Sequence, residues 1–168
     1  MPVNNSSVLG ASLVSSDTTA LFALGTKILG TDNTEWAYCE ATATFVTGEM
    51  VFINANGTAL TALTANLNAP SVAGVDIGFV QFAVNQGEFA FVAKRGSNLY
   101  VLCTSTIAAG TAVGMSANSG RLCNMGETGV GQTLAGIHIT TSASTATAST
   151  ARATVTWPRG LQTTGVIG

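Results

Sequence analysis

Apolar and polar residues alternate over short runs along most of this chain, and helical periodicity is weak throughout. Alternating runs bounded by Gly, Asn and Asp turns predict β-strands. The clearest runs are rich in aromatic and β-branched residues: "DIGFVQFAV" (76–84), "EFAFVAK" (88–94) and "LYVLCTST" (99–106). We expect these three to form a meander, with Lys94-Arg95-Gly96 at the tip of a hairpin. The whole pattern predicts an all-β fold, either a small antiparallel β-barrel or a β-sandwich.

Two distant segments repeat the same order of parts. Residues 48–60 read "GEMVFINANGTAL" and residues 110–122 read "GTAVGMSANSGRL". Each begins with Gly, continues as an apolar strand, turns at Asn and Gly, and ends on a Leu of the next strand. This order fits either a duplicated β unit or two ordinary hairpins.

The ends of the chain differ in composition from its middle. Residues 1–20 are rich in Asn, Ser and Thr and hold few large apolar residues, so this segment cannot bury a core by itself. It predicts an extended N-terminal arm that becomes ordered against a neighbouring subunit. Residues 21–160 form the β-rich domain, and residues 161–168 form a C-terminal tail.

Charge is scarce in this chain. Charged residues make up 8% of the sequence, the net charge is −2 and the mean hydropathy is +0.41, against roughly 25% charged residues in an average soluble protein. So little charge gives weak repulsion between free copies, and we expect other protein to cover much of the surface.

Composition also argues against two other kinds of partner. No run of about 18 apolar residues would make a membrane helix. A small outer-membrane barrel fits poorly with 7% aromatic residues and with the start "MPVNNSSVLG", which has no basic or apolar leader segment. The six Lys and Arg residues are mostly scattered, which argues against a nucleic-acid partner.

Residues for catalysis or cofactor binding do not form a recognisable motif. His138 has no G-x-S-x-G partner motif, and we expect it to be a half-buried structural residue. The loop "GETGVGQT" (126–133) lacks the Lys and the helix context of a phosphate loop. Cys39, Cys103 and Cys123 match no zinc or redox spacing, which predicts buried thiols in a reducing compartment. We therefore expect no enzyme activity, no catalytic, cofactor or metal site, and no small-molecule substrate.

Interface residues are the remaining candidates. Trp, Tyr and Arg are enriched at interface centres, and the arm adds a few apolar side chains. The predicted interface residues are Val3, Leu9, Leu13, Trp36, Tyr38, Trp157 and Arg159. The alternative for Trp36 and Trp157 is a place in the core. Trp157-Pro158-Arg159 ends a strand close to the exit of the chain, which favours a surface position for Trp157.

One long stretch, "LFALGTKILGTDNTEWAYCEATATFVTGEMVFINANGTA" (21–59), resembles the small capsid decoration (cement) proteins of tailed bacteriophages. The resemblance also includes "AAGTAVGMSANSGRL" (108–122), "LAGIHITT" and "RATVTWPRG", and it covers roughly residues 21–160. The resembling features are Leu24-Gly25-Thr26, Gly30-Thr31-Asp32 before a strand with Tyr38, Thr47-Gly48 before a strand, and the turn at Gly57.

This resemblance implies a structural virion protein without catalytic residues. Such a protein is made in the cytoplasm of the host bacterium, binds the major capsid protein on the outside of the assembled shell, and often forms homotrimers at local threefold positions. The alternative is another virion component, such as a head-fibre base or a minor tail protein. A carbohydrate-binding β domain is the second alternative.

Overall fold

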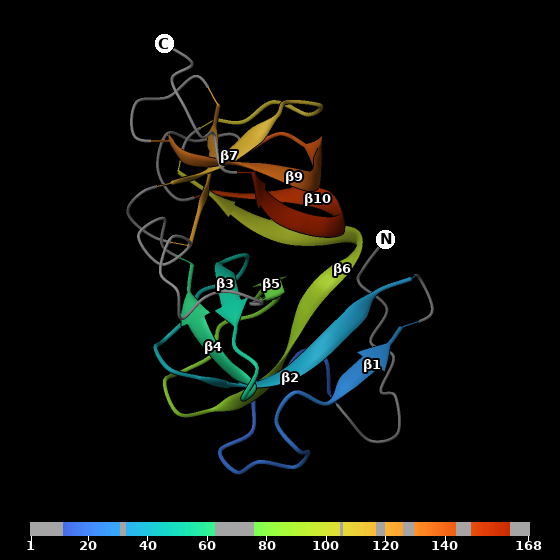
Figure 1. The fold of residues 1–168 in the computed structure, drawn as a ribbon, viewed down its shortest axis with the longest axis vertical. Helices are drawn as coiled ribbons and strands as arrows, with labels where there is room; N and C mark the ends of the chain where they lie inside the picture. Colours follow the sequence, from blue (N-terminus) through green and yellow to red (C-terminus); the bar gives the residue numbers. More distant parts are fainter. Residues whose placement is uncertain are drawn as a thin grey trace.

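The fold is built from strands alone in the part of the chain that the structure describes. The computed structural model describes residues 12–30, 33–62, 76–104, 106–116, 120–125, 130–143 and 149–161. Ten strands and no helix occur in these ranges, so none of the described residues belongs to a helix that could cross a membrane. The strands close into small barrels, which confirms the all-β prediction. Figure 1 shows them in a lower half and an upper half, with β6 passing between.

The first barrel is the lower half in Figure 1. Its strands are β2 (Glu35–Ala41), β3 (Met50–Ile53), β4 (Thr58–Thr61), β5 (Asp76–Phe79) and the first half of β6 (Phe89–Cys103). They are hydrogen-bonded in the order β2-β4-β3-β5-β6, and β6 pairs back with β2 to close the ring. The β2–β4 pairing is parallel and the others are antiparallel. A short strand, β1 (Lys27–Leu29), pairs with β2 at the edge.

The second barrel begins with the strand that ends the first. It consists of the second half of β6 with β7 (Val113–Ser116), β8 (Leu122–Asn124), β9 (Val130–Thr141) and β10 (Ser149–Leu161). The order is β6-β8-β7-β9-β10, and β10 pairs back with β6. The β6–β8 pairing is parallel, as β2–β4 is in the first barrel. The two rings therefore have the same strand order and directions, and they share β6.

The two similar sequence segments lie at equivalent positions in these rings. Residues 48–60 contain the β3–β4 hairpin, and residues 110–122 contain β7 and the start of β8. The turn before each hairpin has a glycine with positive φ, 84° at Gly48 and 78° at Gly110. The amide of Gly48 donates a hydrogen bond to the carbonyl of Val80, which directly follows β5. The amide of Gly110 donates one to the carbonyl of Ile139 in β9, the strand equivalent to β5. A left-handed backbone occurs at both turns, which favours glycine at the first position of each segment.

The hairpin predicted at Lys94-Arg95-Gly96 is wrong, because β6 continues through it. Gly96 has a φ of 150° and Asn98 a φ of 58°, and these residues bend the strand without ending it. Before the bend β6 pairs with β2, and after it β6 pairs with β10. The predicted meander is thus two strands, β5 and a long bent β6.

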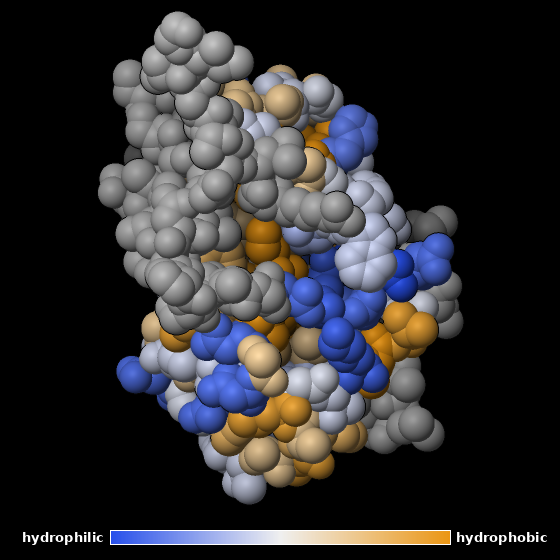
Figure 2. Space-filling view, in the orientation of Figure 1, coloured by the Kyte–Doolittle hydropathy of each residue, from blue (hydrophilic) through white to orange (hydrophobic). Residues whose placement is uncertain are grey.

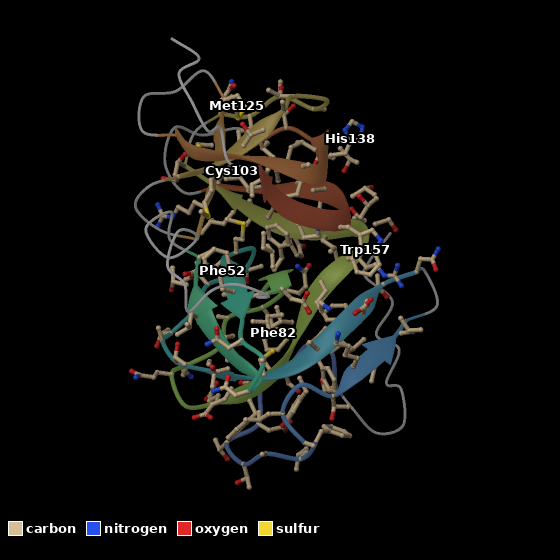
Figure 3. All side chains as sticks on the ribbon, viewed as in Figure 1. Phe52, Phe82, Cys103, Met125, His138 and Trp157 are labelled. Atoms are coloured by element: carbon tan, nitrogen blue, oxygen red, sulfur yellow. The ribbon has the colours of Figure 1, made fainter. Side chains whose placement is uncertain are left out.

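Two groups of buried side chains stabilise the molecule. The smaller one fills the first barrel and includes Phe45, Val51, Val80 and Val92. The larger one runs from the outer face of the first barrel into the second, so that Phe52 and Cys103, both labelled in Figure 3, belong to the same cluster. A hydrogen bond from the amide of Leu102 to the carbonyl of Gly48 (2.7 Å) also joins the halves. This shared core means that the two barrels pack as one unit.

The predicted arm is attached to the first barrel where the structure describes it. Leu13 is buried in the larger cluster, and Asp17 forms an antiparallel bridge with Phe89. Residues 1–11 lie outside the described residues, as do residues 162–168 of the predicted tail.

Candidate interaction surface

The residues considered for catalysis are not arranged as a reaction site. His138 is exposed on β9 rather than half-buried, and it lies opposite Thr154 of β10. Among the described residues no group of three or more His, Cys, Asp or Glu side chains is placed to hold a metal ion. All three cysteines are buried. Burial raises the pKa of Cys39 to about 12 and that of Cys103 to about 11, so neither is poised as a nucleophile.

The two predicted interface residues on β2 lie in the core of this chain. Trp36 is 2% exposed and Tyr38 is fully buried. Tyr38 lies in an aromatic cluster, with its ring 5.2 Å from that of Phe22 and 4.9 Å from that of Phe91. Its hydroxyl accepts a hydrogen bond from the amide of Leu21 (3.0 Å). Tyr38 thus anchors the segment before β1, and burial raises the pKa of its hydroxyl.

The other five interface candidates differ in where the structure places them. Val3 and Leu9 lie outside the described residues, and Arg159 is described only in its backbone, which pairs with Ala135. Leu13 is buried. Trp157 alone of the seven is described with an exposed side chain.

Trp157 is held at the junction of the two barrels. It is 53% exposed and lies within a register shift in β10 between Val155 and Arg159. Gly136 permits this shift, because a side chain there would collide with the Trp157 carbonyl. The guanidinium of Arg95, at the bend of β6, lies over the indole with 4.6 Å from Cζ to the ring centroid. Figure 3 shows Trp157 on the outer side of the molecule beside β6.

An ion-pair network lies behind this stack. Arg95 Nε is 3.2 Å from a carboxylate oxygen of Glu35, without the alignment of a hydrogen bond. The other Glu35 oxygen accepts a hydrogen bond from Lys94 Nζ at 3.0 Å. Lys94 also contacts Asp76, which pairs with Lys27 at 3.8 Å. In Figure 2 hydrophilic residues gather at the level where the two halves meet.

The carboxylates of this network keep Lys94 protonated. The side chains of Lys94 and Glu35 are only 6% and 10% exposed. Burial disfavours the charged ammonium of Lys94, but the hydrogen bonds that this ammonium donates to Asp76 and Glu35 outweigh the effect of burial and raise the pKa of Lys94. Lys94 therefore stays charged across the physiological range and holds Glu35, which in turn orients Arg95 beneath Trp157.

A hollow of about 300 Å³ opens beside the stack. Its walls come from the loop before β2, the bend of β6 and the middle of β10, so both barrels contribute. The lining residues are Asn33, Arg95, Gly96, Ser97, Thr154, Val155, Thr156 and Trp157. Hydroxyl and amide groups thus surround an exposed indole, an arrangement suited to binding a surface segment of another molecule.

Comparisons with known proteins do not assign a family. No protein-family model matches the chain, and no curated protein matches its sequence. Among solved structures, the head fiber gp8.5 N base of bacteriophage phi29 is similar, with a TM-score of 0.42 and 10% sequence identity. The match covers 72% of this chain and 92% of that chain. At this identity and TM-score the similarity does not indicate what the chain does.

The sequence identified Trp157 but missed its surroundings. Glu35, Lys94 and Asp76 are up to 59 residues apart in the chain and look like isolated charges. The single sequence feature that points to this region is the adjacent pair Lys94-Arg95, the only two neighbouring basic residues in the chain.

Proposed function

We propose that this protein is a structural component of a phage virion, which binds the outside of the assembled capsid and stabilises it. The sequence resemblance to phage decoration proteins supports the virion role. The proposed partners are the major capsid protein and further copies of the same chain in a homotrimer, and no enzyme activity is proposed.

The observation that carries this proposal is a surface with few charges and many exposed apolar side chains. Only 8% of residues are charged, and Figure 2 shows hydrophobic residues exposed on the lower half. The large apolar residues exposed in the described part of the chain are Val14, Leu21, Leu24, Leu29, Val46, Met125 and Trp157. Such a surface favours contact with other protein over a free monomer in solution.

The mechanism follows from mass action. A protein that binds the mature shell more tightly than the earlier shell shifts the equilibrium toward the mature form. Many copies on one particle, each bound through a modest interface, then resist opening of the shell together.

The arm is proposed to add affinity by ordering against a neighbouring subunit. Because Leu13 and Asp17 contact the first barrel, the deletion that tests this role removes residues 1–11 and keeps residues 12–20. A truncated protein that reaches the same occupancy on shells as the full chain would contradict a docking role for the deleted residues.

Cryo-electron microscopy of the particles that carry this chain tests the proposal. Density at many equivalent positions of the shell, in hundreds of copies, is the expected result. Density at a single vertex or on the tail would instead favour a head-fibre base or a minor tail protein. Absence of the chain from particles would refute a virion role and favour a carbohydrate-binding domain.

A further inference from the structure

We infer that the hollow beside Trp157 is a docking site for an acidic surface segment of the shell protein. This inference rests on the proposed function, because it names the part of the chain that contacts the capsid. Three properties of the hollow support it: an anchored aromatic side chain, walls from both barrels, and an excess of positive charge.

Trp157 is an anchor that loses little freedom on binding. Its indole is already fixed against Arg95, and Arg95 is fixed by the buried carboxylate of Glu35. Exposed tryptophans that are rigid before binding contribute strongly at interface centres. Most other exposed apolar residues are aliphatic and have no such support, so Trp157 is the described side chain best suited to dominate a contact.

The charges around the hollow favour an acidic partner. Four of the six basic residues lie in this region, namely Lys27, Lys94, Arg95 and Arg152. Among the residues that the structure describes, they face the carboxylates of Glu35 and Asp76. The whole chain nevertheless has a net charge of −2. The positive charge is therefore concentrated at the junction and complements an acidic segment.

Arg152 extends this basic surface along β10. It stacks over the ring of Tyr100, with 3.3 Å from Cζ to the ring centroid, and donates a hydrogen bond to the carbonyl of Asn98 at the bend (2.7 Å). Arg152 and Thr154 are two residues apart on the strand, so their side chains are on the same face of β10. A bound segment that covers Trp157 thus reaches Arg152 by continuing along β10.

The first test measures binding of the full-length chain to purified shells that lack it. Trp157→Ala should weaken binding about tenfold or more. Gln86→Ala, which removes an exposed side chain from the turn before β6, serves as the control and should bind like the wild type. Equal binding by Trp157→Ala and the wild type would overturn the inference while leaving the proposed function intact.

The second test addresses the chemistry of the occupant. Binding to the same shells should weaken as salt rises from low to high concentration, and Arg152→Gln should weaken binding at low salt and reduce its dependence on salt. Unchanged affinity across the salt range would show an apolar occupant and refute the acidic segment. A change in the oligomeric state of Trp157→Ala, measured by light scattering without shells, would show that a second copy occupies the hollow, which also refutes the inference.

Fluorescence gives a direct measure of contact at the hollow. Of the two tryptophans, Trp36 is buried and Trp157 is exposed, so acrylamide should quench mainly Trp157. Shell binding should protect this quenchable component, and Trp157→Phe should abolish it. Quenching that stays the same on bound shells would contradict the inference. A wild-type chain that does not bind shells at all would overturn the proposed function and this inference together.

Discussion

Replacing Lys94 with methionine should destabilise the protein, because it removes the closest cation from the buried carboxylate of Glu35. Breaking a buried ion pair by removing one partner costs about 3–5 kcal/mol. Glu35 would keep Arg95 at 3.2 Å, and the half-exposed Asp76 would keep Lys27 at 3.8 Å. These remaining cations place the expected loss near the lower limit, at about 3 kcal/mol.

Thermal and urea unfolding of Lys94→Met measure this loss. For a chain of this size a loss of 1 kcal/mol lowers Tm by roughly 2–4 °C, so Tm should fall by about 6–12 °C. The double variant Lys94→Met/Glu35→Leu should recover at least half of the loss, because no buried carboxylate is then left without its cation. Lys27→Met, at the exposed end of the network, should change stability by less than about 1 kcal/mol.

The pH dependence gives an independent check on the same pair. The pKa of Lys94 is raised in the folded protein above 10.5, its value in an unfolded chain. The stabilisation is therefore complete below pH 10.5 and is lost as the pH rises through the folded pKa. The difference in stability between wild type and Lys94→Met should be constant near neutral pH and shrink in alkali. A single variant as stable as the wild type at neutral pH would refute the reasoning.

Three further predictions concern other parts of the fold. Gly48→Ala should lower the free energy of unfolding by roughly 1–3 kcal/mol more than Gly87→Ala. Both glycines have a positive φ, but only the side chain added at position 48 would meet the backbone of the second barrel. Equal melting temperatures of the two variants would contradict this reasoning. The three cysteine thiols should not react with a thiol reagent in the native protein at pH 8 and should all react after denaturation; fast native labelling would show that they are accessible. Deleting residues 1–20 should lower Tm by about 4 °C or more, since it removes the buried Leu13. Deleting residues 1–11 should leave Tm unchanged. An equal effect of both deletions on Tm would show that loss of Leu13 is not the cause.

Local properties of the sequence determined the strands and most of the turns. Alternation of side chains across a strand, and glycines at turns that need a positive φ, act over a few residues and can be read directly. They predicted the all-β fold and the two hairpins of similar sequence. They also favoured a surface position for Trp157, which is exposed. The strand end predicted at Trp157-Pro158-Arg159 is wrong, because β10 continues through these residues to Leu161.

Strand pairing, burial and charge contacts were decided by the tertiary structure. Gly96 and Asn98 are typical turn residues, and the same backbone freedom that ends a strand also lets β6 bend and continue into a second barrel. Which outcome occurs depends on the strands that supply hydrogen bonds on each side of the bend, and those are far away in the chain. The burial of Trp36 and the pairing of Glu35 with Lys94 likewise depend on contacts between distant residues. Local sequence fixed where strands can form, and only closure of the two rings determined which side chains meet.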